Sequence, residues 1–173
     1  MTVIDSAVEA NAVRAKTYDK SLGQPPAPKL VIVTCMDPRL TGILQMLGLG
    51  TGDADVIRNA GSVINEDSIR SLLVSTRVLG TKEIMIINHT DCGMQTFTDR
   101  DLEQKLENIT GESPVAPARF YSFRDLAANT REQIRRVKSH PWIPKDIPVR
   151  GFVYDVSTGS LREVTATAAT VAA

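Results

Sequence analysis

The sequence predicts an α/β fold with a largely parallel central sheet. Three short runs of strand character, at residues 30–34, 54–61 and 83–88, are separated by segments with helical spacing or turn residues. The first and third runs, LVIVT and EIMIIN, are mostly apolar, which is typical of strands that are covered on both faces. At 173 residues, the chain suits one domain whose core needs no disulfide bonds.

The N-terminal part is expected to form a helical arm and a linker. Residues 1–22 are polar and helix-permissive, with only a weak apolar stripe. The segment GQPPAPK (23–29) ends any helix, because proline lacks the amide donor and fixes φ. After the first strand, residues 40–47 favour a short helix that Gly48 and Gly50 end.

An amphipathic helix is predicted between the second and third strands. Asn65 offers an N-cap, and apolar side chains share one face as far as Leu79. Gly80 is the expected left-handed residue after the helix.

Helices and a strand pair are expected in the C-terminal half. Residues 99–109 have a charged helical pattern, and residues 119–139 are predicted to form an amphipathic helix that includes Phe120 and Phe123. Residues 150–164 indicate a strand, a turn and a short return strand. Residues beyond 164 are of low complexity and are expected to fray.

Composition argues against several classes of function. The formal net charge is zero, so no global attraction to nucleic acid or to a membrane is implied. No segment approaches the ~20 apolar residues that span a bilayer, and the N-terminus lacks the apolar region of a secretory signal. We therefore expect a cytoplasmic protein that acts on a small molecule, in a compartment where thiols stay reduced.

The residues able to carry chemistry lie at the carboxyl ends of two strands, where open α/β sheets bind ligands. Cys35 follows the first strand, and His89 with Cys92 follows the third. One imidazole and two thiolates are good zinc ligands, and three protein ligands leave the fourth position that catalytic zinc sites keep open. On the residues alone, two alternatives stay open, since the cysteines could be small core residues or a redox pair. The spacing of His140 argues against a fourth ligand there.

Three further residues adjoin these ligands. In CMDPR, Arg39 can hold Asp37 through two parallel hydrogen bonds, which keeps the carboxylate ionised and oriented. The alternative is an ordinary surface ion pair, which contributes little. Gly93 offers free amides to an anion if a helix begins there, or else it marks a plain turn.

At these residues the sequence resembles the β-class carbonic anhydrases. That family carries Cys-x-Asp-x-Arg followed by His-x-x-Cys, with a strand–helix–strand unit between them, and the motifs here are CMDPR and HTDCG. The resemblance is strong over residues 28–96 and looser over GFVYDVSTGSL. It implies a mostly parallel sheet with flanking helices and an antiparallel edge strand. It also implies that zinc is bound by Cys35, His89 and Cys92, that Asp37 and Arg39 form a catalytic dyad, and that Gly93 binds bicarbonate.

The resemblance implies an activity and an organisation as well. The activity is the zinc-dependent reversible hydration of carbon dioxide to bicarbonate and a proton by metal-bound hydroxide, and Asp37 can be a fourth zinc ligand in a closed state. Residues 1–27 would form the arm and linker, residues 28–164 the zinc-binding catalytic domain, and residues 165–173 a tail. The arm would wrap a partner subunit in a homodimer or larger homo-oligomer, with no nucleic acid or membrane as partner.

Two competing functions stay open at this point. Carbonyl sulfide and carbon disulfide hydrolases resemble this family and share its zinc ligands, so only the access channel would distinguish their substrates. A non-catalytic zinc-binding protein is the other alternative. The presence of both Asp37 and Arg39 argues against it, because a purely structural zinc site needs neither residue.

Overall fold

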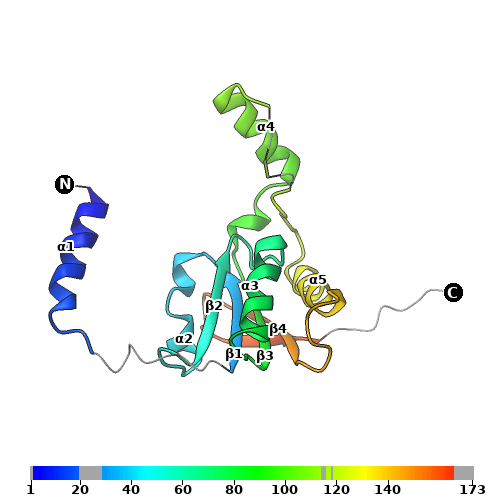
Figure 1. Ribbon diagram of the computed structural model, residues 1–173. Coiled ribbons are helices and arrows are strands. Elements are labelled where there is room, and N and C mark those ends of the chain that lie inside the picture. Colours follow the sequence, from blue (N-terminus) through cyan, green and yellow to red (C-terminus); the bar gives the residue numbers. More distant parts are fainter. Residues whose placement is uncertain (1, 20–28, 114–115, 118, 166–173) are drawn as a thin grey trace.

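A five-stranded sheet organises the computed structural model, which describes residues 2–19, 29–113, 116–117 and 119–165 (Figure 1). The strands occur in the order β2-β1-β3-β4-β5. The first four pair in parallel, and β5 is antiparallel to β4, as predicted. Their bounds are β1 Leu30–Cys35, β2 Ala54–Asn59, β3 Glu83–His89, β4 Val149–Tyr154 and β5 Leu161–Val164.

The apolar runs form the centre of the sheet because helices and loops cover both of its faces. On one face, α3 (Glu66–Arg77) and α5 (Leu126–Ser139) pack against alternate residues of β1 and β3. On the other face, Ile32 and Ile87 pack with Ile43 of the short helix α2 (Ile43–Met46). Since β1 and β3 are parallel neighbours, with Thr34 opposite Ile87, their carboxyl ends lie at the same edge.

Helix α5 lies close to β4 because Gly151 has no side chain. A Cβ built there would lie 2.5 Å from Ile134 Cδ1 and 2.8 Å from Thr130 Cγ2, which is closer than real Cβ contacts come. The helix therefore brings buried side chains down onto the sheet, including the polar Thr130 and Gln133.

Several predicted boundaries are shorter in the structure. Strand β2 ends at Asn59, and residues 38–46 form a 3-10 turn, Pro38–Leu40, followed by the single turn of α2. Asn65 caps α3 as expected, with its side chain accepting a 2.9 Å hydrogen bond from Ser68 N. That helix ends at Arg77, and Gly80 follows with a positive φ of 85°.

The predicted helix over residues 119–139 is wrong in its first third, because α5 begins only at Leu126. Residues 119–125 contain no helix, and Tyr121 has a φ of +61°, which a right-handed helix does not allow. The Asp99 carboxylate instead accepts hydrogen bonds from three consecutive backbone amides, those of Phe120, Tyr121 and Ser122. Phe120 and Phe123 therefore lie on an irregular loop that hydrogen bonds to Asp99 hold in place, although their spacing predicts a helix.

Two helices, α1 and α4, lie away from the sheet in Figure 1. Every described side chain of α1 (Val3–Ala15) is exposed, and α4 (Asp99–Thr110) has no buried residue. Among the helices of the described residues, none is long and apolar enough to cross a membrane. Most of the predicted linker and all but one residue of the predicted tail lie outside the described residues.

Candidate metal centre

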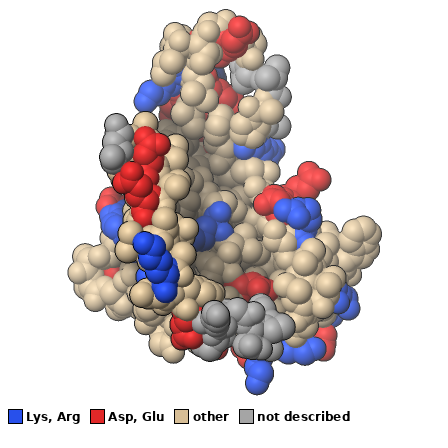
Figure 2. Space-filling model, turned by 60° about the vertical axis from the view of Figure 1, so that its left-hand side comes forward, with Lys and Arg blue, Asp and Glu red and all other residues tan. Residues whose placement is uncertain are grey.

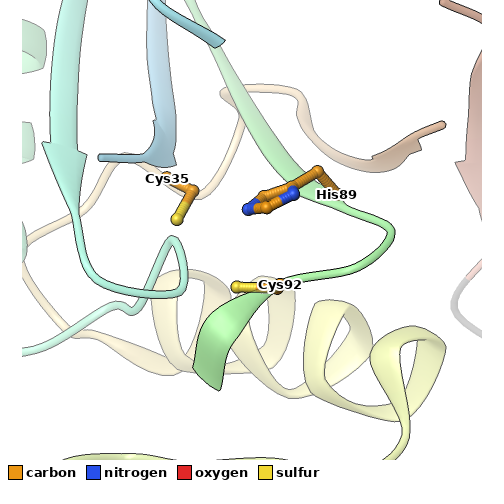
Figure 3. Close-up of side chains that lie close together, drawn as sticks. All are labelled: Cys35, His89 and Cys92. Carbon is orange, nitrogen blue, oxygen red and sulfur yellow. The ribbon is translucent and has the colours of Figure 1, made fainter. Parts of the chain in front are cut away.

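Cys35, His89 and Cys92 converge at the carboxyl edge of the sheet, as the motif spacing predicts. All three are buried, and one ligand atom from each lies within 4.8 Å of the others. Figure 3 shows the two sulfurs and the imidazole facing a common point. Donor atoms that share one zinc ion lie roughly 3–4 Å apart, given bonds of ~2.0–2.3 Å. Small side-chain adjustments therefore suffice to close the three donors on a single ion.

The turn between His89 and Cys92 brings both residues to this point. Asp91 adopts the left-handed region with a φ of +55°, which short acidic side chains tolerate better than most. Thr90 anchors the turn to the neighbouring strand, because its amide donates to the Tyr154 carbonyl over 2.9 Å. The chain can thus reverse within three residues and place the Cys92 sulfur beside the His89 ring.

The imidazole of His89 is oriented for metal binding. Its Nδ1 lies 2.9 Å from the Thr90 carbonyl oxygen, which can only accept, so Nδ1 carries the proton. The other nitrogen, Nε2, is buried without a hydrogen-bond partner and keeps a free lone pair. An orphaned buried acceptor beside two thiols fits a cation, and a backbone carbonyl that fixes the tautomer is the usual support of a metal-ligating histidine.

The two cysteines form no disulfide bond, and each shifts the pKa of the other. A hydrogen bond from Cys92 lowers the pKa of the Cys35 thiol, and the same bond raises the pKa of Cys92. Burial alone would lower the pKa of His89, but the adjacent Cys35 sulfur and its negative charge raise it above the ordinary value. Each group thus favours negative charge on Cys35, which a dication would neutralise. Thiolate and imidazole donors in this ratio suit zinc.

Asp37 and Arg39 form the bidentate pair that the sequence predicts. Arg39 Nε donates to Asp37 Oδ1 over 3.0 Å, and Nη2 donates to Oδ2 over 2.8 Å. The Arg39 hydrogen bond is the main reason that the pKa of Asp37 is well below its usual range. Asp37 Oδ2 lies 3.9 Å from His89 Nε2. The carboxylate is therefore ionised, fixed and adjacent to the metal ligands.

Sequence reasoning missed two residues that brace this pair. Asp91 accepts from Arg39 Nη1 over 2.7 Å with its side chain and from Nη2 over 2.9 Å with its carbonyl, so Arg39 ties the two ligand-bearing loops together. Arg58 of β2 donates to the carbonyls of Cys35 and Asp37 over 3.0 and 2.7 Å. An acid inside HTDCG was the available signal for Asp91, whereas the contacts of Arg58 depend on strand register.

The remaining predicted residues take different places. Gly93 begins a 3-10 turn, Gly93–Gln95, directly after the ligand Cys92, so its backbone adjoins the metal centre. His140 caps the end of α5, and its Nδ1 accepts from Trp142 N over 3.3 Å. Within the described residues, the group able to hold a metal consists of Cys35, His89 and Cys92, without His140.

Comparisons with known proteins agree with this site. The family model for carbonic anhydrase matches residues 30–161, which include both motifs. The chain is 44% identical to β-carbonic anhydrase 1 of Mycobacterium tuberculosis over 95% of this chain and 99% of that protein. It is 34% identical to a carbon disulfide hydrolase of Saccharolobus solfataricus over 93% of this chain and 90% of that protein. Its fold is similar to that of a carbonic anhydrase from Streptococcus mutans, with a TM-score of 0.87 and 39% identity over 95% of this chain and 99% of that one.

Proposed function

The chain belongs to the β-class carbonic anhydrases, which hydrate carbon dioxide, and on this premise we propose that Cys35, His89 and Cys92 hold the zinc ion that this reaction requires. The observation that carries the proposal is the convergence of two thiols and the unpartnered Nε2 of His89 in one buried cluster. Three protein donors leave a coordination position for water or substrate.

The protein's own groups have distinct roles in this proposal. Zinc, when bound, lowers the pKa of a coordinated water and so supplies a nucleophile near neutral pH. Asp37 Oδ2 accepts a hydrogen bond from the attacking oxygen. This bond orients that oxygen so that its free lone pair faces carbon dioxide. Arg39 keeps that carboxylate ionised and correctly oriented. The amide of Gly93 donates to an oxygen of the product bicarbonate.

Asp37 is also proposed as a fourth zinc ligand in a closed state. Its Oδ2 lies 3.9 Å from His89 Nε2, so a modest side-chain rotation would bring it into the metal's coordination shell. The rotation would break both hydrogen bonds from the Arg39 side chain, which favour the open arrangement described above.

Metal analysis combined with a carbon dioxide hydration assay tests the proposal directly. The purified protein is expected to contain one zinc per chain and to accelerate hydration in stopped flow. Chelation should remove the metal and the activity together, and added zinc should restore both. A protein without stoichiometric zinc, or one whose hydration rate survives complete chelation, would contradict the proposal.

A second candidate function is the hydrolysis of carbon disulfide or carbonyl sulfide on the same scaffold. The 34% identity to a carbon disulfide hydrolase over nearly the whole chain supports this second function. Attack on S=C=O is close chemistry to attack on O=C=O, and pocket shape alone discriminates modestly between such substrates. Parallel assays of sulfide release and carbon dioxide hydration on one preparation separate the two functions.

We propose that the protein acts as a homodimer or larger homo-oligomer. Helix α4 exposes an apolar stripe, with Leu106 and Ile109 39% and 68% exposed, and α1 exposes Val8 and Val13. Helices that bury no face against their own domain need another surface to become stable. A second copy of the chain supplies that surface, in keeping with the proposed layout of an arm in residues 1–27 and a catalytic domain in residues 28–164.

Replacing Leu106 with glutamate is expected to weaken this assembly, because a charge would then enter an apolar interface. Sedimentation should show the mass shifting from two or more chains toward one. Gln104→Glu, which adds the same charge on the opposite face of α4, is the control and should leave the mass unchanged. If Leu106→Glu keeps the mass of the parent protein, as the control does, α4 is excluded from the interface.

The partner and location predictions follow from charge and redox state. Figure 2 shows acidic and basic side chains mixed over the visible face, without a broad field of one sign. Such a surface suits a small neutral substrate better than nucleic acid or an anionic membrane. A cytoplasmic, reducing location would keep both unpaired cysteines available as metal ligands.

A further inference from the structure

A buried chain of hydrogen bonds links helix α5 to the sulfur of Cys35. The Thr130 hydroxyl has two acceptors for its one hydrogen. Its Oγ1 lies 3.1 Å from Asn88 Oδ1 and 2.8 Å from the Leu126 carbonyl oxygen. Asn88 Nδ2 donates to the Gly61 carbonyl over 2.8 Å, and Gly61 N donates to Cys35 Sγ over 3.4 Å. Thr130 and Asn88 are at most 1% exposed, so water does not compete for these bonds.

The orientation of the Asn88 amide follows from its neighbours. The Gly61 carbonyl can only accept, so the nitrogen of the amide must face it and the oxygen must face Thr130. The opposite orientation would place two acceptors 2.8 Å apart. Successive strand residues point to opposite faces, so Asn88 points toward α5, on the face of Ile84 and Ile86, whereas His89 points to the other face.

The loop after β2 is shaped to bring one amide against the sulfur. Gly61 has a φ of +81°, and a Cβ there would lie 3.1 Å from Met94 Cγ and 3.3 Å from Phe123 Cε1. The next residue is held by the same strand, since Ser62 Oγ donates to the Ile87 carbonyl over 2.7 Å. Two consecutive residues of β3, Ile87 and Asn88, are therefore hydrogen-bonded to two consecutive residues of this loop, 61 and 62.

We propose that Asn88 is a positioning residue of the metal centre, holding the Gly61 loop so that the Gly61 amide donates to the Cys35 sulfur. This inference rests on the proposed metal-binding role of Cys35. A hydrogen bond draws charge from a thiolate and fixes its direction, and outer partners of this kind commonly change metal affinity 10–100-fold. Asn88 thus acts on the metal through Gly61 and Cys35, without touching metal or substrate.

Two variants and a matched control test the proposal. Asn88→Ala removes the donor to Gly61, and Thr130→Val removes the hydroxyl that orients the Asn88 amide. Ser75→Ala is the control, because Ser75 is equally buried and bonds Asp55 and Thr81 over 2.7 and 2.8 Å, in a network without metal-ligating residues. The measurements are zinc affinity by competition with a chromophoric chelator, and the thiolate-to-metal charge-transfer band of the cobalt-substituted protein.

Asn88→Ala is expected to weaken zinc binding about 10–100-fold. Its charge-transfer band should move to longer wavelength, because a thiolate that loses a hydrogen bond releases an electron more easily. Thr130→Val should shift both quantities in the same direction by less, and Ser75→Ala should shift neither, even if it unfolds more easily.

The outcomes separate this inference from the proposed function. Unchanged zinc affinity and an unchanged band in the two variants would overturn the role of Asn88 while leaving the zinc site intact. If Asn88→Ala does not fold, Thr130→Val alone decides by the same criteria. An unmodified protein that binds no zinc would overturn both proposals, whereas one that binds zinc without hydrating carbon dioxide would contradict only the proposed function.

Discussion

Replacing Cys92 with serine is expected to abolish zinc binding and carbon dioxide hydration together. The substitution changes one sulfur to oxygen at a buried position, so the fold has little to accommodate. A serine hydroxyl stays protonated at neutral pH and is a poor zinc ligand, which leaves the ion only Cys35 and His89. Zinc per chain should fall close to zero in elemental analysis, and the hydration rate should equal that of buffer.

Circular dichroism provides the check on folding for this variant. The strands that carry the ligands are built from apolar residues packed between helices, so the spectrum of Cys92→Ser should match that of the zinc-free parent. Retention of one zinc per chain with an unchanged hydration rate would show that Cys92 is not a ligand, and the assignment of the metal centre would then fail.

Replacing Asp37 with alanine should have the second largest effect, with the zinc retained. Cys35, His89 and Cys92 remain in place, so elemental analysis should still find one zinc per chain. The hydration rate should fall ~10²-fold or more, the usual contribution of a positioned acid–base group. The reason is that the carboxylate held by Arg39 no longer orients the attacking oxygen.

A similar ion pair elsewhere in the chain provides the control for Asp37→Ala. Asp67 also accepts two hydrogen bonds from one arginine, Arg70, on the exposed surface of α3. Asp67→Ala should leave zinc content and hydration unchanged, because exposed pairs contribute little to stability and this one adjoins no metal ligand. Equal rates for Asp37→Ala and the parent protein would remove the dyad from the mechanism.

The sheet was predictable because its central strands, β1 and β3, are short, mostly apolar and closely followed by turn residues. Parallel pairing of β1 and β3 then placed Cys35 and His89 at one edge, so the ligand set followed from position in the chain. The segment 119–125 was not predictable in the same way. Its local spacing favours a helix, and only the distant Asp99 carboxylate, which binds three of its amides, imposes another path.

The supporting residues of the site were beyond sequence reasoning for a related reason. Asn88 looks like an ordinary polar residue at the end of an apolar strand, and its partners Gly61 and Thr130 are 27 and 42 residues away in the chain. Arg39 and Asp37 were recognisable because they are near neighbours, but the second acceptor of Arg39, Asp91, lies 52 residues further on. Sequence motifs identify the metal ligands, whereas the residues that support the ligands can be found only from tertiary contacts.

The bonds between Asp99 and residues 120–122 have an evolutionary consequence. They join the two ends of the excursion that contains α4, so this segment leaves and rejoins the body at one place. A lineage can lengthen, trim or exchange the excursion while the ligand-bearing strands keep their register. The quaternary contacts proposed for α4 and the chemistry at the sheet edge therefore depend on separate parts of the chain and can change independently.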